Sequence, residues 1–110
     1  MVRVAFYVIA LSIALAAPAI AEDAKDVGEK VFTAQKCSLC HSVAGKGNAK
    51  GPLDEVGSKS TPDEIRAWIT DAKGMTAKTK PARKPEMKAF DLPKSDVDAL
   101  VAYLSAMKKK

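Results

Sequence analysis

Hydrophobic residues recur every three or four positions in three separate segments, which is the pattern of helices that each bury one face. The first segment covers residues 23–36, with Asp23 as a possible N-cap. The second covers residues 61–74 and opens with the capping-box sequence Thr61-Pro62-Asp63-Glu64. The third follows a predicted N-cap at Ser95 and has the clearest stripe. The apolar positions of the three stripes are Val27, Val31, Phe32, Ile65, Trp68, Ile69, Val97, Leu100, Val101 and Leu104.

The segments between these helices, residues 42–60 and 75–93, lack any periodicity. They are rich in Gly, Pro and Lys, which favour turns and extended chain, and they contain no clear strand pattern. The sequence therefore predicts an all-α domain of three or more helices with long loops.

Residues 1–21 have the features of a secretory signal peptide. Eighteen of them are apolar, Arg3 is the only charged residue, and Ala19 and Ala21 fit an A-x-A-like cleavage site. The apolar run is shorter than the roughly 20 residues of a membrane-spanning helix. We expect cleavage before Glu22, export to the periplasm and a mature domain of residues 22–110; an uncleaved membrane anchor is the alternative.

The mature chain is too small to build a large core. It has 89 residues, of which 34 are apolar, and 12 of those are Ala. Domains of this size usually need a disulfide, a metal or a cofactor for stability. Seventeen basic and 13 acidic residues give it a formal charge of +4, which favours an acidic protein partner and is too small for a nucleic-acid-binding arm.

The two cysteines of the chain stand in the sequence Cys37-x-x-Cys40-His41, the attachment signature of c-type haem. Two thiols at this spacing can form thioethers to the vinyl groups on one porphyrin edge, and the adjacent histidine can then bind the iron. Three alternatives are a thioredoxin-like dithiol, a zinc site and a structural disulfide. The first lacks a preceding strand, the second lacks four ligands, and the third would close too short a loop to restrain the chain.

Residues 24–107 resemble the class I cytochromes c. The motifs that carry the resemblance are Gly28-x-x-x-Phe32, the haem signature, Gly51-Pro52-Leu53 with Val56-Gly57, Lys84-Pro85-Glu86-Met87-x-x-Phe90, and Leu100-Val101-Ala102-Tyr103-Leu104. Many relatives have one more residue between the proline and the leucine of the second piece. The resemblance implies a cytochrome c fold wrapped around one haem c, attached through Cys37 and Cys40.

The resemblance also implies particular roles for several residues. His41 would be one axial ligand of the iron, with its other ring nitrogen hydrogen-bonded to the Pro52 carbonyl. Gly28 and Phe32 would meet Tyr103 where the first and last helices cross.

The sixth ligand is expected to be Met87, with Met75 as the alternative. Met87 lies in an extended segment shortly before the last helix, where the family has its axial methionine, although Lys88 follows it where many relatives have proline. Met75 follows Lys73-Gly74 and precedes a loop that could also cover the haem. Met107 lies at helical spacing from Leu104 and is expected in the core.

A histidine and a methionine on one iron favour a high reduction potential and a closed coordination sphere, which suits an electron carrier. We therefore expect a monomeric one-electron carrier, not an enzyme, that acts between periplasmic or membrane redox partners and meets the membrane only through partner complexes. The alternatives are a haem c subunit of a periplasmic redox enzyme and an open-site gas sensor.

Six basic residues between positions 73 and 88 could steer an acidic partner or form a solvated loop; they are Lys73, Lys78, Lys80, Arg83, Lys84 and Lys88. No aromatic residue interrupts this run, so single-stranded nucleic acid is not an expected ligand.

Overall fold

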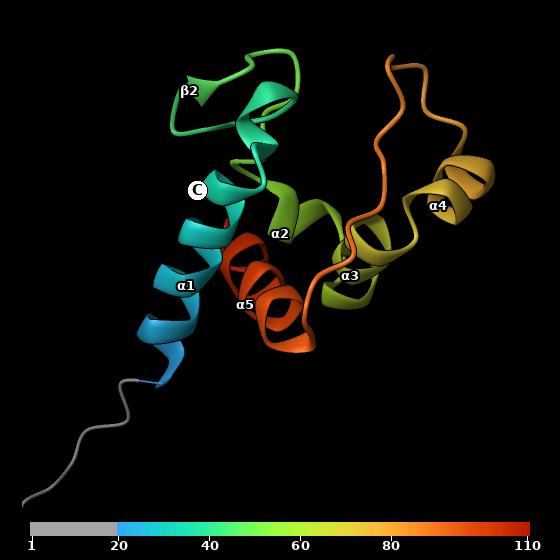
Figure 1. Cartoon of the computed structure of the whole chain (residues 1–110). Coiled ribbons are helices and arrows are strands. Elements are labelled where there is room, and N and C mark those ends of the chain that lie inside the picture. Colours follow the sequence, from blue (N-terminus) through green and yellow to red (C-terminus); the bar gives the residue numbers. More distant parts are fainter. Residues whose placement is uncertain (1–19) are drawn as a thin grey trace, which may run out of the picture.

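The computed structural model describes residues 20–110, and the predicted signal peptide falls almost entirely on residues 1–19, outside the described residues (Figure 1). The first helix, α1 (Ile20–Ala34), begins earlier than predicted. No proline or glycine interrupts residues 20–27, so the helix continues through Asp23, which is therefore not its N-cap. The helix ends two residues before the predicted Lys36, whose left-handed backbone (φ 57°) turns the chain.

The second predicted helix is in fact two. Helix α3 (Pro62–Thr70) begins with the predicted capping box: Thr61 Oγ1 accepts from the Glu64 amide, and Glu64 Oε1 accepts from the Thr61 amide. The chain then bends at Asp71, whose side chain caps a separate helix, α4 (Ala72–Thr79). The prediction of an extended segment from residue 75 is thus wrong for residues 75–79, because the Asp71 cap starts a new helix there.

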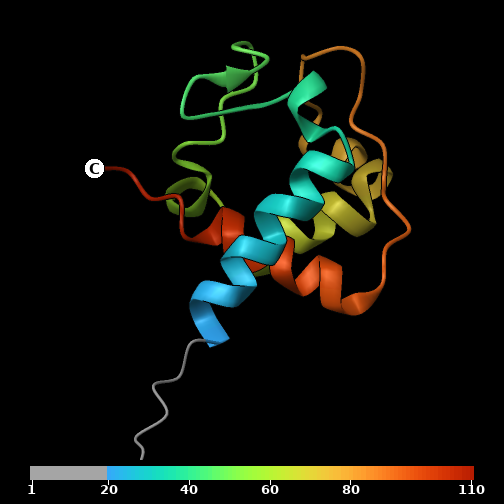
Figure 2. The ribbon, with the colours of Figure 1, turned by 60° about the vertical axis from the view of Figure 1, so that its left-hand side comes forward.

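The last helix, α5 (Lys94–Ser105), lies where the sequence predicts it, but its N-cap is Pro93 and not Ser95. It packs between α1 and α3, and these three helices enclose the hydrophobic core (Figures 1 and 2). The buried core residues are Val31, Phe32, Ile65, Ile69, Val97, Leu100, Val101 and Leu104. Met107 lies beyond the end of α5 and packs against this core, in agreement with its predicted core role.

The crossing of α1 and α5 is close because Gly28 has no side chain. A Cβ atom at this position would collide with the carbonyl oxygen of Ala99 and would lie 2.5 Å from the Cβ of Tyr103. One turn further along α1, the ring of Phe32 meets the ring of Tyr103 edge to face, with centroids 5.9 Å apart. The crossing predicted for Gly28, Phe32 and Tyr103 is therefore confirmed.

The segment between residues 42 and 60 contains short regular elements that the sequence pattern did not indicate. Strands β1 (Ser42–Val43) and β2 (Lys46–Gly47) pair antiparallel. Their two-residue turn has positive φ at both Ala44 (51°) and Gly45 (79°), as a tight hairpin of the usual twist requires. A short helix, α2 (Val56–Lys59), follows and contacts α5. Strands of two residues are too short to produce an alternating pattern.

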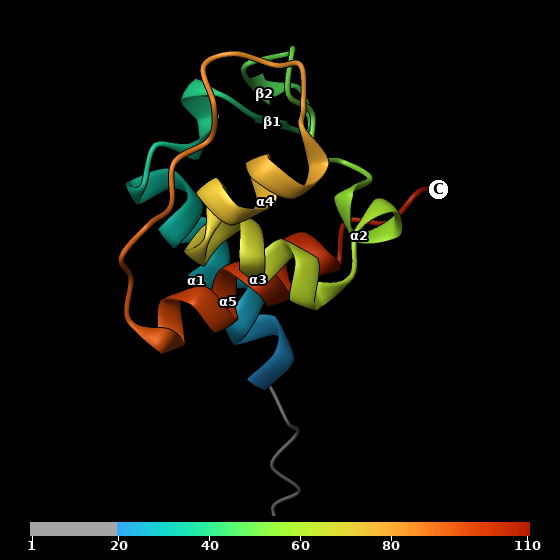
Figure 3. The same ribbon diagram turned by 90° about the vertical axis from the view of Figure 1, so that its right-hand side faces the viewer.

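Residues 80–93 form the extended segment that leads from α4 back to α5, and they pass the end of the molecule where the β hairpin lies (Figure 3). The amide of Phe90 donates to the carbonyl of Ile69 at 2.8 Å, which fixes the later part of the segment to α3. Among the helices of residues 20–110, none is both long enough and apolar enough to cross a membrane.

Candidate functional site

The haem signature lies in a tight turn directly after α1. Residues Cys37–Leu39 form a 3-10 helix, η1, and the amides of Cys40 and His41 both donate to the Cys37 carbonyl, at 3.1 and 2.9 Å. The thiols of Cys37 and Cys40 are free, so the disulfide considered from the sequence is not formed. Cys37 is half-buried, and this burial raises the pKa of its thiol. The turn follows a helix and not a strand, unlike a thioredoxin-like site.

Asn48 holds three more carbonyls of this turn, a role that no sequence motif indicated. Its backbone amide donates to the carbonyls of Ser38 (3.0 Å) and His41 (3.1 Å), and its side-chain amide donates to the carbonyl of Leu39 (3.1 Å). The β hairpin makes this possible because it brings residue 48 back beside η1. The turn is thus restrained by contacts from outside the motif.

The ring of His41 is oriented by a backbone carbonyl. Its Nδ1 atom lies 3.1 Å from the carbonyl oxygen of Gly51. A carbonyl can only accept, so Nδ1 carries the proton and Nε2 keeps its lone pair free for a metal. The acceptor differs from the expectation, which was the carbonyl of Pro52.

The path of the chain around Ser42 explains this difference. The amide of Ser42 donates to the carbonyl of Gly51 at 3.0 Å, and the carbonyl of Ser42 accepts from the amide of Leu53 at 2.9 Å. Pro52 is held between these two bonds, alongside Ser42. The carbonyl that reaches the His41 ring is therefore that of Gly51, the residue before Pro52.

The surroundings of His41 favour its neutral form. Burial of the half-buried ring lowers the pKa of His41, the hydrogen bond to Gly51 opposes this effect, and the nearby positive charge of Arg83 adds to it. A histidine binds a metal through its neutral ring, so this environment suits a ligand.

Arg83, one of the six basic residues between positions 73 and 88, also contacts the haem signature directly. Its guanidinium donates through Nη2 to the carbonyl of Cys40. It also lies against Gly51, where an added Cβ atom would collide with the guanidinium and with the Cys40 carbonyl. No local sequence signal distinguishes this arginine from its basic neighbours, because its partner is more than forty residues away.

The two candidate methionines have different environments. Met87 is half-buried in the extended segment of residues 80–93, whereas Met75 lies within α4 and is only 9% exposed. The side chain of Met75 is therefore already enclosed by the protein, while Met87 lies on a segment outside any helix.

The donor set fits a haem c better than a metal held by protein alone. Two free thiols, an oriented imidazole and a thioether are the groups that such a cofactor requires. Among residues 20–110, no group of three or more His, Cys, Asp or Glu side chains could hold a metal ion, so the zinc alternative finds no ligand set there. In the same residues, no large side chain is less than 2% exposed. A core this small fits a domain whose centre a cofactor completes.

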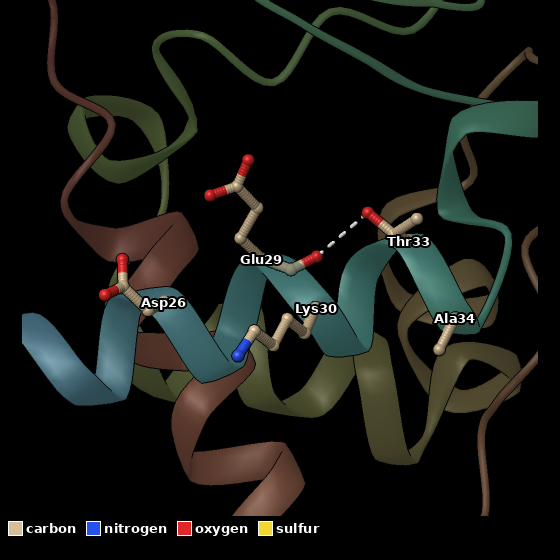
Figure 4. A pocket seen from close by; sticks show the side chains of 5 residues that line it. All are labelled: Asp26, Glu29, Lys30, Thr33 and Ala34. Atoms are coloured by element: carbon tan, nitrogen blue, oxygen red, sulfur yellow. Dashed lines mark hydrogen bonds between the residues drawn. The ribbon is translucent and has the colours of Figure 1, made fainter.

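The exposed face of α1 has a shallow depression that bears none of this chemistry (Figure 4). It is lined by Asp26, Glu29, Lys30, Thr33 and Ala34, and the Thr33 hydroxyl donates to the carbonyl of Glu29 at 3.1 Å. This contact lies within one helix and orients no group toward a ligand.

Comparison with known proteins identifies one family and one distant relative. The family model "Cytochrome c" matches residues 26–108. Cytochrome c oxidase subunit 2 of Alkalihalophilus pseudofirmus is 29% identical over 90 residues, which cover 74% of this chain and 25% of that protein. The matched region thus spans about a quarter of that relative. No solved structure matches.

Proposed function

Because this chain belongs to the cytochrome c family, we propose that it is a single-haem electron carrier in which His41 and Met87 bind the iron and Cys37 and Cys40 hold the porphyrin. Family members exchange electrons with redox-protein partners. When bound, the haem supplies a one-electron couple between ferric and ferrous iron.

Each protein residue has a defined part in this proposal. The thiols of Cys37 and Cys40 each add across a vinyl group: sulfur bonds to one carbon, the thiol proton goes to the other, and no oxidant is needed. His41 presents Nε2 in an orientation set by the Gly51 carbonyl. Met87 supplies the sixth ligand, and a filled coordination sphere leaves no open position for substrate or gas.

The observation that carries the proposal is the hydrogen bond between His41 Nδ1 and the Gly51 carbonyl. His41 belongs to the Cys-x-x-Cys-His sequence of the chain, and a proton held on Nδ1 by this bond leaves the lone pair of Nε2 free for a metal. Histidines that bind a metal almost always donate their other ring N–H to such an acceptor.

The test is the optical spectrum of protein expressed with a haem-attachment system. Wild type, Met87→Ala and Met75→Ala would be compared, oxidised and reduced, with and without carbon monoxide. We expect the weak far-red band of iron-methionine bonding in wild type and Met75→Ala, and its loss in Met87→Ala. Loss of the band only in Met75→Ala would reassign the ligand. Rapid carbon monoxide binding by wild type would favour the gas-sensor alternative.

The redox partner is proposed to be acidic. Lys73, Lys78, Lys80 and Lys88 are exposed in and around the extended segment. Lys84 is also exposed but pairs with Glu86 at 2.7 Å. Electron transfer to an acidic partner should slow as ionic strength rises, because salt screens the attraction. A rate that does not change with salt would leave these lysines as a solvated surface.

A second candidate function is a haem c subunit or domain of a larger redox enzyme. The similarity to cytochrome c oxidase subunit 2 supports it, since part of that protein resembles this chain. Affinity purification from detergent-solubilised membranes of the source cells would distinguish the two. Stoichiometric recovery of a larger catalytic chain supports the subunit, whereas recovery of the haem protein alone supports the free carrier.

We also propose periplasmic export with cleavage before Glu22, supported by the apolar leader and its A-x-A end. N-terminal sequencing of the protein from a periplasmic extract tests this. An intact N-terminus in the membrane fraction would instead support an uncleaved anchor.

A further inference from the structure

The segment that bears Met87 is fastened on both sides of the methionine. On one side, the Arg83 guanidinium donates to the Cys40 carbonyl. On the other side, the Phe90 amide donates to the Ile69 carbonyl at 2.8 Å. Residues 83–90, here called the methionine strap, therefore run between the haem signature and helix α3.

The two anchors differ in what they join. The Phe90 bond ties the strap to Ile69 of α3, which belongs to the hydrophobic core. The Arg83 bond ties it to the turn that presents Cys40 and His41. Arg83 also packs against Gly51, whose carbonyl orients the His41 ring. Arg83 thus contacts groups that hold His41, the proposed fifth ligand, in place. It also belongs to the segment that bears Met87, the proposed sixth ligand.

The contact depends on features that only an arginine supplies here. The guanidinium donates to one carbonyl with one nitrogen, Nη2, while another, Nη1, lies against Gly51. A lysine ammonium is a single point charge and cannot occupy both places at once. The absence of a side chain at Gly51 gives the guanidinium its room.

We infer that Arg83 is a positioning residue that latches the methionine strap onto the haem signature and so keeps Met87 on the iron. This inference rests on the proposed function, because it assumes that Met87 is the sixth ligand. Without the latch, the strap remains attached at Phe90 but its leading half is free to lift. The methionine then competes less well with an external ligand for the iron.

The experiment is an imidazole titration of the haem-loaded ferric protein, followed by the loss of the far-red band. The variants are Arg83→Gln and Arg83→Lys, with Lys84→Gln as a control that removes the neighbouring exposed cation. We expect Arg83→Gln to bind imidazole about tenfold more tightly than wild type, as the loss of one charge-assisted hydrogen bond allows. Arg83→Lys should shift in the same direction, and Lys84→Gln should stay within about twofold of wild type.

Urea unfolding of the same proteins separates positioning from general stabilisation. The inference holds if imidazole binding tightens in both Arg83 variants beyond the Lys84 control. It is overturned if Arg83→Gln binds imidazole like wild type, even where its urea midpoint falls, since the arginine is then merely structural. If wild type itself lacks the far-red band, the proposed methionine ligation is overturned, and the proposed role of Arg83 with it. If wild type shows the band and Arg83→Gln binds imidazole like wild type, only the role of Arg83 is overturned.

Discussion

Replacement of Gly28 by alanine tests the close packing of α1 against α5. Gly28 is buried on α1 where that helix crosses α5. An added Cβ atom would lie 2.5 Å from Tyr103 Cβ and 2.8 Å from the carbonyl carbon of Ala99, and closer still to the Ala99 oxygen. Ordinary van der Waals contact begins near 3.4 Å. The two helices must therefore separate by roughly 1 Å.

The expected cost follows from two opposing effects. Overpacking a core costs about 1–3 kcal/mol, and the upper end applies because the obstructing Ala99 atoms are backbone and cannot rotate away. Alanine is a better helix former than glycine by about 1 kcal/mol. The net expectation is a loss of about 2 kcal/mol in the free energy of unfolding, which corresponds to roughly 10 °C in Tm for a domain of this size.

The assay is urea unfolding of haem-loaded protein, followed by far-ultraviolet circular dichroism. Gly74→Ala is the matched control, because Gly74 also lies in a helix but its nearest obstruction is the carboxylate of Asp71, a side chain that can move. Its helix-propensity gain and the weakened Asp71 cap should nearly cancel, leaving a change within about 1 kcal/mol. If Gly28→Ala is as stable as wild type, the close crossing does not limit packing and the reasoning fails.

Two further predictions concern helix ends and charge. Thr61→Ala removes the hydroxyl that accepts from the Glu64 amide, so urea unfolding should show a loss of about 1 kcal/mol, whereas no change would mean that solvent replaces the cap. The Lys94 ammonium, and then the Arg66 guanidinium, lower the pKa of the Asp98 carboxyl below its ordinary value of 3.8. The unfolded chain therefore takes up this proton first, and the stabilisation, present above pH 3.8, is lost as the pH falls through the lower folded pKa. Asp98→Asn should reduce the fall in the free energy of unfolding at acid pH, measured by urea unfolding at a series of pH values. An unchanged pH dependence would contradict the assignment.

Local patterns along the chain were sufficient for the features whose causes are local. The capping box at Thr61 depends on residues three apart, and the long stripe of α5 depends on helical spacing, so both were predictable. The Cys37-x-x-Cys40-His41 sequence likewise brings its three groups together within one turn. The cytochrome c resemblance extended these local signals to the α1 and α5 crossing, which the close contact at Gly28 confirms.

One feature with a local cause was nevertheless missed: helix α4 has little amphipathic pattern of its own, and the bond from the Gly74 amide to the Asp71 side chain starts it. Other features were decided by contacts between residues farther apart in the chain. The carbonyl that orients His41 belongs to Gly51 and not to Pro52, because the backbone pairing of Ser42 sets which peptide faces the ring. A sequence pattern reports how residues alternate between solvent and core, but it does not report which distant backbone group a side chain will reach. Only the tertiary structure could bring Arg83 to the haem signature.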